Sequence, residues 1–402
     1  MESNAQYTMK KIYLTGAFLL LSLFILNKTY GQSDTLKPLK IAIFAPLYLD
    51  NAFEGASYTT PKESIPKNIL PGLEFYNGVM MAIDSLANSG TKLEVNIYDT
   101  KQPESYLSSM LNGAELNNVS LIIGSFTSSQ EVKRFGDQAL KRNIPLISAT
   151  YPNVGGINAN PFFVLLNSSF QTHLRGIYKY LYTSYPTTNI IAFRKAGSVG
   201  DYIKNTFSDL NKMSKTTPLK IKWVELSEAF TSKDVMNQLD SNANNVVLVA
   251  SPIESFGLDI VKTISNFEQY RTTAVGMPTW DGIKELNSKS CRNVDIVYST
   301  PFNYTRSDNT EASFVKRYKA KFYSRPSDMV FRGYETTFHF GKLLMQYQNN
   351  FINNLSSNQY TIFNDFDLKP VKVKESSTVP DYLENKKLYF IRKQEGNIKS
   401  IL

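Results

Sequence analysis

A hydroxyl-rich turn follows one of the most apolar runs in the chain. The run at residues 119–123 ends at Gly124 and is followed by Ser-Phe-Thr-Ser-Ser-Gln-Glu. A run as apolar as this predicts a parallel strand that is buried on both faces. Ser128 and Glu131 have the spacing of a capping box, which predicts that a helix begins here. The first N–H groups of such a helix can hold a carboxylate, although the motif alone is more often an ordinary capped helix.

Predicted strands and amphipathic helices alternate along the chain in two consecutive series. The first series has strands at 40–46, 93–98, 119–123 and 144–147, with helices at 73–87, 106–114 and 132–140. The second series has strands at 189–193, 219–226, 245–250 and 272–275, with helices at 201–210, 233–239 and 256–267. Each parallel connection needs a covering helix. The pattern therefore predicts an α/β fold with two doubly wound parallel-sheet lobes and a cleft between them.

Two extended apolar segments, 161–166 and 295–300, predict crossings between the lobes. Helical patterns follow the second crossing, and strand-like segments end the chain. Repeated crossings predict a multi-strand hinge, because few residues then need to absorb the motion of a closing cleft. The predicted organisation is a signal peptide at 1–31, a first lobe from 38–162 with 304–350, and a second lobe from 163–303 with 351–402.

The N-terminus has the pattern of a secretory signal. Two lysines precede an apolar run at 12–26, and Thr29 and Gly31 then supply small residues, which predicts cleavage after Gly31. The run is shorter than the roughly 20 residues of a spanning helix, although an uncleaved anchor stays an alternative. Cys291 is the only cysteine, so no lipid-accepting cysteine follows the signal. We expect a soluble protein of the periplasm.

Charge and motif content argue against several classes of function. The formal net charge of the 402-residue chain is +9, which becomes +7 without the three lysines and one glutamate of the signal. This excess is scattered, so nucleic acid is not an expected partner. His173 and His339 lie outside any metal-ligand spacing, and no Walker A loop, G-x-S-x-G elbow or dinucleotide fingerprint follows a strand. We expect no enzyme activity, metal or cofactor, although a carboxylate-pair hydrolase leaves no local signature.

Six segments carry a resemblance through their order and spacing. They are Lys-Ile-Ala-Ile-Phe-Ala-Pro at 40–46, Gly-Val-Met-Met-Ala-Ile-Asp at 78–84, Ile-Ile-Gly-Ser-Phe-Thr-Ser-Ser at 122–129, Ile-Pro-Leu-Ile-Ser-Ala-Thr at 144–150, Gly-Ser-Val-Gly-Asp-Tyr at 197–202 and Arg-Gly-Tyr-Glu at 332–335. The chain resembles the type I periplasmic binding proteins, and within them the leucine/isoleucine/valine-binding, LivJ-like branch of ABC-transporter solute receptors. The resemblance implies a receptor that closes on an amino acid or related small solute and delivers it to an ABC permease in the inner membrane.

The resemblance also implies a site between the lobes. A ligand carboxylate would meet hydroxyls and free N–H groups at two strand ends of the first lobe. The candidate residues there are Ser128, Ser129, Ser148, Ala149, Thr150 and Tyr151. The ligand's ammonium needs an acceptor, for which Asp281 is the first candidate and Glu254 its competitor. Trp280, Tyr151 and Phe126 are expected to form an apolar wall, with core packing as the alternative, and Tyr202 is a further candidate.

A second class of function fits the same resemblance. Some type I domains have lost transport and serve as envelope sensors or as scaffolding and interaction modules, and a fold does not establish a function. A preserved polar clamp favours the receptor, whereas an appended domain, which this sequence does not show, would favour the module. The long segment 50–71 lies at the predicted mouth of the cleft, where it either covers the ligand or forms a surface loop.

Overall fold

The computed structural model describes residues 39–59, 65–88, 92–214, 217–304 and 309–401. The predicted signal peptide lies outside the described residues. The strands form two seven-stranded sheets and one short hairpin.

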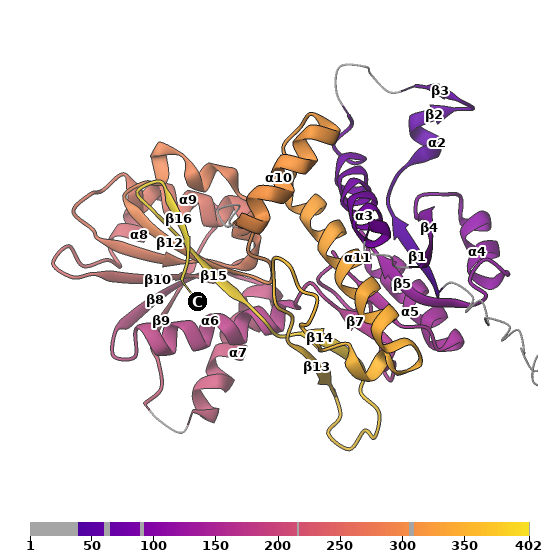
Figure 1. The fold of residues 1–402 in the computed structure, drawn as a ribbon. Helices are drawn as coiled ribbons and strands as arrows, with labels where there is room; N and C mark the ends of the chain where they lie inside the picture. The colour runs from indigo at the N-terminus through magenta and orange to yellow at the C-terminus, as the bar shows by residue number, and fades with distance from the viewer. Residues whose placement is uncertain (1–38, 60–64, 89–91, 215–216, 305–308, 402) are drawn as a thin grey trace, which may run out of the picture. The chain divides into compact units, whose positions relative to one another are not determined.

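The first sheet has the strand order β13-β14-β7-β6-β5-β1-β4. Its strands are β1 (Leu39–Ala45), β4 (Leu93–Asp99), β5 (Val119–Gly124), β6 (Leu146–Ser148), β7 (Phe163–Leu165), β13 (Leu368–Val371) and β14 (Tyr382–Asn385). The helices α3 (Leu70–Asn88), α4 (Glu104–Asn112), α5 (Ser129–Arg142) and α11 (Asp328–Tyr347) accompany it (Figure 1). β1, β5, β6, β7 and β14 pair in parallel in this order, and β13 pairs antiparallel with β14.

The second sheet has the strand order β16-β15-β12-β11-β10-β8-β9. Its strands are β8 (Asn189–Lys195), β9 (Lys220–Leu226), β10 (Asn245–Val249), β11 (Thr272–Val275), β12 (Val294–Thr300), β15 (Tyr389–Gln394) and β16 (Asn397–Ser400). The helices α6 (Phe170–Ser184), α7 (Ser198–Met213), α8 (Ser232–Met236) and α9 (Glu254–Ser265) accompany it, and three short 3-10 helices connect β11 to β12: η1 (Pro278–Gly282), η2 (Lys284–Asn287) and η3 (Lys289–Cys291). The remaining elements are α2 (Leu49–Ala52), β2 (Phe53–Glu54), β3 (Ser57–Tyr58), α10 (Asn309–Phe322), η4 (Gln348–Asn350) and η5 (Ile352–Asn354).

The two sheets repeat one topology. In chain order, the first five strands of each sheet are arranged second, first, third, fourth, fifth: β4-β1-β5-β6-β7 and β9-β8-β10-β11-β12. The order therefore reverses between β1 and β5 and again between β8 and β10. Ligands of open α/β sheets bind beyond the carboxyl ends of strands at such a reversal. The predicted fold class of two doubly wound lobes is confirmed.

Two glycines bring α3 and α11 into backbone contact. A Cβ atom on Gly78 would lie 2.0 Å from the carbonyl oxygen of Val330, and one on Gly333 would lie 2.2 Å from the carbonyl oxygen of Phe75. No side chain fits at either position, so both residues must be glycine for the helices to approach this closely. Both glycines belong to the segments that carried the family resemblance, and their spacing reflects helix packing in the first lobe.

The predicted lobe boundaries need correction. Residues 163–165, placed in the second lobe from sequence, form β7 of the first sheet, and β13 and β14 also join that sheet. The crossing follows β7, because the apolar segment pairs with β6 before the chain leaves the first lobe. The segment 295–300 is likewise a strand, β12, of the second sheet. The C-terminal part of the chain is divided: β13 and β14 complete the first sheet, and β15 and β16 complete the second.

The segment 50–71 contains a small hairpin in its described part. Phe53 and Tyr58 pair across β2 and β3, and their rings contact edge to face with centroids 5.5 Å apart. Both side chains are exposed.

A buried polar network lies where β14 leads out of the first sheet. The carboxylate of Glu384 accepts hydrogen bonds from the Ser169 N–H at 2.9 Å, the Thr172 hydroxyl at 2.6 Å and the Lys386 ammonium at 2.6 Å. Burial alone would raise the pKa of Glu384, but the bonds from Lys386, Thr172 and Ser169 hold it below the usual range. Neighbouring Asn385 donates to the Leu166 carbonyl and accepts from the backbone N–H of Asp367. These bonds join the crossing after β7 to the crossing after β14.

Ile122→Ala tests the packing of the hydrophobic core around the first sheet. Ile122 is fully buried in β5 between β1 and β6, so truncation leaves a cavity and should lower the free energy of unfolding by about 2 to 5 kcal/mol. Chemical denaturation measures the change. Met213→Ala, at a side chain that is 77% exposed, is the control and should change it by less than about 0.5 kcal/mol. Equal effects of the two substitutions would contradict the described packing.

Candidate functional site

A buried aspartate fixes the turn at the strand reversal of the first sheet. Asp99, at the end of β4, is 5% exposed, and its carboxylate accepts hydrogen bonds from the N–H groups of Leu47, Leu49 and Lys101 at 2.8 to 2.9 Å. Within this turn Tyr48 has φ of 55°, a left-handed conformation that is costly for a large side chain. The three bonds to Asp99 hold the turn in that conformation.

The turn after β5 forms a helix cap whose charge is balanced. The Ser128 hydroxyl accepts from the Glu131 N–H at 3.2 Å, as the capping-box spacing predicts. The Glu131 carboxylate accepts from the Thr127 N–H at 2.7 Å and pairs with the Lys101 ammonium at 2.5 Å. The pair with Lys101 compensates the negative charge at this strand end. Among the described residues, the N–H of Ser129 at the start of α5 has no partner and is free to meet an anion.

Hydroxyl groups converge on the same place from β6. The Thr150 hydroxyl lies 3.3 Å from the Ser125 hydroxyl and donates to the Phe126 carbonyl at 3.1 Å. The Tyr151 and Ser129 hydroxyls lie 3.4 Å apart. β5 and β6 pair with Gly124 opposite Ser148, so the turns that follow them are neighbours. The structure brings together four of the predicted carboxylate-binding residues: Ser128, Ser129, Thr150 and Tyr151.

Three predicted site residues are fully buried. Ser148 and Ala149 have no exposed surface, and the Ala149 N–H donates to the Gly124 carbonyl as part of the sheet. Trp280 is also fully buried in the core of the second lobe, where its ring lies against Gly257 and Gly276. The expectation that Trp280 walls a ligand is therefore wrong for this structure: two glycines open a slot that its ring fills. Ser148 and Ala149 therefore pack inside the first lobe at the end of β6 and do not face solvent.

The strand reversal of the second sheet holds a cavity of about 240 Å³. It lies at the carboxyl ends of β8 and β10 and is lined by residues 195–200 and 250–253. Gly197 precedes α7 with φ of 114°, which only glycine adopts without strain. Val199 and Ile253 line the cavity and are 48% and 45% exposed. The wall is thus largely apolar, unlike the hydroxyl-rich turns of the first lobe.

Two predicted residues flank this cavity. Tyr202 lies on α7 and is 43% exposed, and its ring contacts Phe170 with centroids 6.3 Å apart. Glu254 begins α9 directly after Ile253 and is exposed. Both residues lie close to lining residues in sequence, but neither lines the cavity itself.

Asp281 lies in a different environment from the one predicted. Its carboxylate accepts a hydrogen bond from the Thr300 hydroxyl at 3.2 Å. It lines a cavity of about 630 Å³ whose other walls include Tyr298, Tyr304 and the β16 strand. The serine and threonine side chains of the first lobe line neither this cavity nor the one at the ends of β8 and β10. Glu254 follows a lining residue of the cavity at the strand reversal, whereas Asp281 lines the other cavity.

Sequence reasoning missed Asp99 and Lys101. Both belong to a polar Asp-Thr-Lys sequence directly after the predicted strand 93–98, at the edge of the sheet where ligands bind. Their place at a strand end was the available signal.

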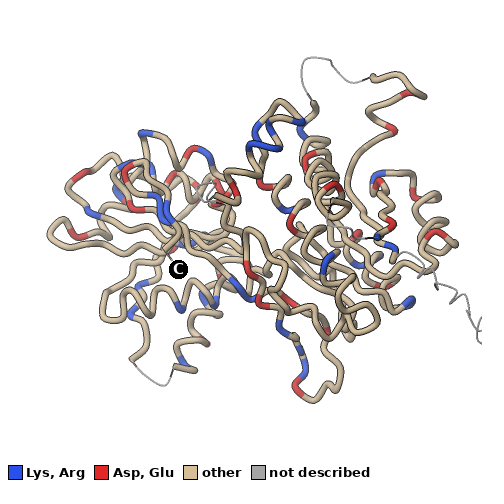
Figure 2. The backbone as a smooth tube through the Cα atoms, viewed as in Figure 1, with Lys and Arg blue, Asp and Glu red and all other residues tan. Residues whose placement is uncertain are grey.

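Within the described ranges no group of three or more His, Cys, Asp or Glu side chains can hold a metal ion. Over the same ranges no helix has the length and apolar character needed to cross a bilayer. Lysines and arginines are spread over elements of both sheets (Figure 2).

Comparisons with known proteins extend the fold assignment. No family model matches the sequence, and no curated protein sequence matches it. Solved structures do. A putative branched-chain amino acid ABC transporter from Rhodospirillum rubrum has a TM-score of 0.64 at 12% identity, covering 90% of this chain and 100% of that one. An ABC transporter substrate-binding protein from Desulfitobacterium hafniense has 0.60 at 11%, covering 91% and 100%. LivJ from Streptococcus pneumoniae, in complex with isoleucine, has 0.53 at 15%, covering 91% and 99%. The chain has the type I periplasmic binding protein fold of these neighbours.

The buried histidine of α6 makes stability depend on pH. His173 is 2% exposed, its Nδ1 lies 2.8 Å from the Ser299 hydroxyl, and burial lowers its pKa to about 4. Between pH 6.5 and about 4 the unfolded chain binds a proton at this histidine that the folded chain does not. The histidine's contribution is therefore retained above pH 6.5 and lost as the pH falls toward 4, by up to about 3 kcal/mol.

His173→Asn removes this proton linkage and should make the loss of unfolding free energy between pH 7 and pH 4.5 smaller. Denaturant titrations at several pH values measure it. Glu335, whose pKa burial raises to about 7, titrates in the same window with the opposite effect, so the comparison is between variant and wild type rather than within one curve. Parallel pH curves for the two proteins would show that another group is responsible.

Proposed function

We propose that the protein is a periplasmic solute receptor that closes on an amino acid or a related compound with a carboxylate head and an apolar side chain. The observation that carries this proposal is the contrast between the two strand reversals. The first presents hydroxyls and a free helix N–H, and the second presents exposed apolar side chains around a cavity of about 240 Å³. A ligand held by both lobes would meet a polar group on one side and an apolar wall on the other.

The fold supports the same class of ligand. The neighbours are described as ABC transporter substrate-binding proteins, and those from Desulfitobacterium hafniense and Streptococcus pneumoniae were solved with leucine and isoleucine. At identities of 10 to 15% this likeness concerns the fold, so the ligand assignment rests on the residues of this chain. Delivery to an ABC permease in the inner membrane, export through the predicted signal at 1–31, and the absence of catalysis belong to the same proposal.

Particular residues carry the proposed clamp. Ser129 and Thr150 hydrogen-bond the ligand carboxylate, for which the Thr150 hydroxyl turns from the Phe126 carbonyl to the ligand, and the free N–H at the start of α5 adds a third donor. The hydroxyl of Tyr151, which lies beside that of Ser129, also contacts the ligand carboxylate. Glu254 accepts the ligand ammonium from the second lobe, and Tyr202 borders the apolar side chain. Asp281 is kept as the competing acceptor.

Ligand binding should stabilise the folded protein. A solute present at about 100 times its dissociation constant adds about 2.7 kcal/mol to the free energy of unfolding, because it binds the folded state only. A thermal-shift screen of apolar amino acids, polar amino acids, sugars and short peptides measures this effect. Leucine, isoleucine, valine and the aromatic amino acids are expected to give the largest increases in melting temperature. A flat response over the whole screen would contradict the receptor and favour the alternative of an envelope sensor or scaffolding module.

Substitutions at the clamp should weaken binding without unfolding the protein. Ser129→Ala and Thr150→Val each remove a hydroxyl from a charge-assisted bond and should cost about 1.5 to 3 kcal/mol of binding free energy. Glu254→Gln should cost at least as much, and Asp281→Asn should have little effect. Calorimetric titration with the ligand from the screen measures all four. Ser109→Ala, at an exposed serine of α4, is the matched control.

The outcome distinguishes the two acceptors. Wild-type affinity in Glu254→Gln together with a large loss in Asp281→Asn would move the ammonium site to the cavity beside β12. Wild-type affinity in both Ser129→Ala and Thr150→Val would place the carboxylate site elsewhere.

A further inference from the structure

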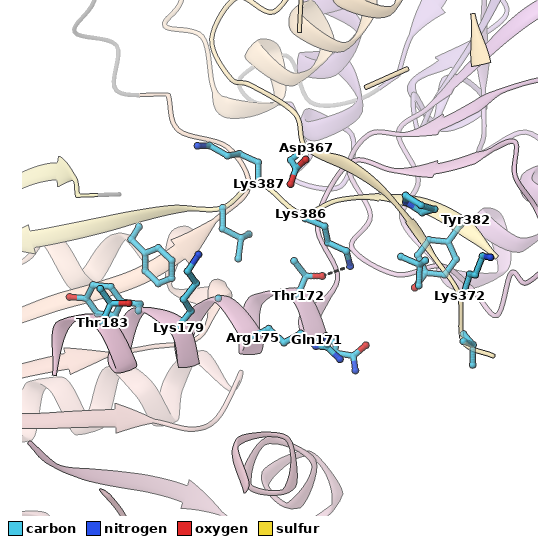
Figure 3. Close-up of a pocket in the computed structure, with 17 residues that line it drawn as sticks. Gln171, Thr172, Arg175, Lys179, Thr183, Asp367, Lys372, Tyr382, Lys386 and Lys387 are labelled. Atoms are coloured by element: carbon cyan, nitrogen blue, oxygen red, sulfur yellow. Dashed lines mark hydrogen bonds between the residues drawn. The ribbon is translucent and has the colours of Figure 1, made fainter. Parts of the chain in front are cut away.

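A groove of about 1000 Å³ runs along α6, away from the strand reversals (Figure 3). One wall is the helix face that carries Gln171, Arg175, Lys179 and Thr183 at intervals of four residues. The other wall is formed by the β13–β14 hairpin and the segment that follows it, with Lys372 and Lys387 among its residues. The thirteen residues from Gln171 to Thr183 extend the helical wall over about 18 Å.

Most of the charged residues that line the groove are positive. Five cations line the groove: Arg175, Lys179, Lys372, Lys386 and Lys387. Lys386 is already bound to the buried carboxylate of Glu384 and to Thr172. Within the described part of the chain, none of the other four cations has a carboxylate at ion-pair distance. Among the described residues that line the groove, Asp367 alone is acidic, and it pairs with Lys369 at 2.9 Å.

Protection of a sheet edge explains only some of these residues. β13 is the edge strand of the first sheet, and lysine and proline on an edge discourage pairing with other chains. That accounts for Lys369 and Pro370. It does not account for Arg175 and Lys179, which lie on the helix that forms the other wall of the groove (Figure 3). Cations repelling one another across a groove cost free energy unless an anion lies between them.

The groove also has apolar surface between its cations. Gly176 lies on the floor, where a Cβ atom would come within 2.5 Å of the Leu388 side chain, so the glycine lets Leu388 lie against the helix. Val371 and Val373 line the hairpin wall, and Val373 is 77% exposed. A ligand made only of charged groups would leave this surface uncovered.

We propose that this groove binds an extended acidic segment of a partner protein, with carboxylates that alternate with apolar side chains. The charge is complementary to the four cations that have no carboxylate partner among the described residues, and the apolar groups cover Leu388 and Val373. At about 3.3 Å per residue, five or six residues of an extended chain span the helical wall. A flat bilayer cannot enter a concave groove, and an inorganic polyphosphate has no apolar groups to match its floor. The groove is separate from the proposed solute site and does not depend on it.

Binding of a fluorescent Glu-Val-Glu-Val-Glu-Val-Glu-Val peptide to the full protein tests this inference. Fluorescence anisotropy at low ionic strength should show saturable binding, and the Gln-Val counterpart of the peptide should bind at least tenfold more weakly. Inorganic polyphosphate of similar charge should compete poorly. Raising the salt concentration should weaken binding, because partly exposed charges are screened.

A charge-reversed pair provides the matched variants. Arg175→Glu with Lys179→Glu should weaken peptide binding by tenfold or more. Lys316→Glu with Lys319→Glu, at exposed positions of α10, changes the net charge equally and should leave binding unchanged. Both double variants should retain the wild-type melting temperature within a few degrees, which shows that they fold. Equal losses in both pairs, tighter binding of polyphosphate than of the peptide, or no binding by the wild type would each overturn the proposal.

Discussion

Glu384 is the residue on which the connection between the lobes depends. Its buried carboxylate is stable only because three donors surround it, from Ser169, Thr172 and Lys386. The donors at Ser169 and Thr172 belong to the start of α6, in the chain's first passage out of the first sheet, whereas Glu384 itself belongs to the last. A buried carboxylate without partners costs several kcal/mol, so the two passages are held at one distance from each other. Motion of the lobes must then be absorbed on either side of this network.

The turn after β5 shows how charge is kept low where we propose that a ligand carboxylate binds. Glu131 would repel a carboxylate if it stood alone at the start of α5. The ammonium of Lys101 and the N–H of Thr127 bind the Glu131 carboxylate, so its negative charge is compensated within the turn. What remains for a ligand is a set of neutral donors, and such donors favour a ligand whose own charge is already balanced, such as a zwitterion, over a free inorganic anion.

Periodicity and apolar runs predicted the central strands and helices well, because the residues within each of these segments determine its secondary structure. The run at 245–250 became β10 and the helical pattern at 73–87 lies within α3. β13 and β14 were missed because Lys369 and Pro370 lie at an edge and Glu384 is buried by partners far along the chain. Trp280 was misplaced for a related reason: the slot it fills is made by Gly257 and Gly276, and no local pattern reveals that a distant glycine lies opposite a ring. Hydroxyl-rich strand ends, by contrast, could be recognised because parallel topology brings them together.

The discontinuity of the first lobe also bears on how the chain folds. The second sheet takes β8 to β12 from one uninterrupted stretch, so most of its pairings are available as soon as that stretch is present. The first sheet is complete only when β14 has joined it, and α3 is covered only when α11 has packed on it. Ser327 and Glu74, for example, are joined by a hydrogen bond at 2.8 Å and are 253 residues apart in sequence. Pairings of such long range are slow to form because loop closure precedes any gain from contact. We therefore expect the backbone contact at Gly78 and Gly333 to form late in folding, and the face of α3 that packs on α11 to be open to other chains until then.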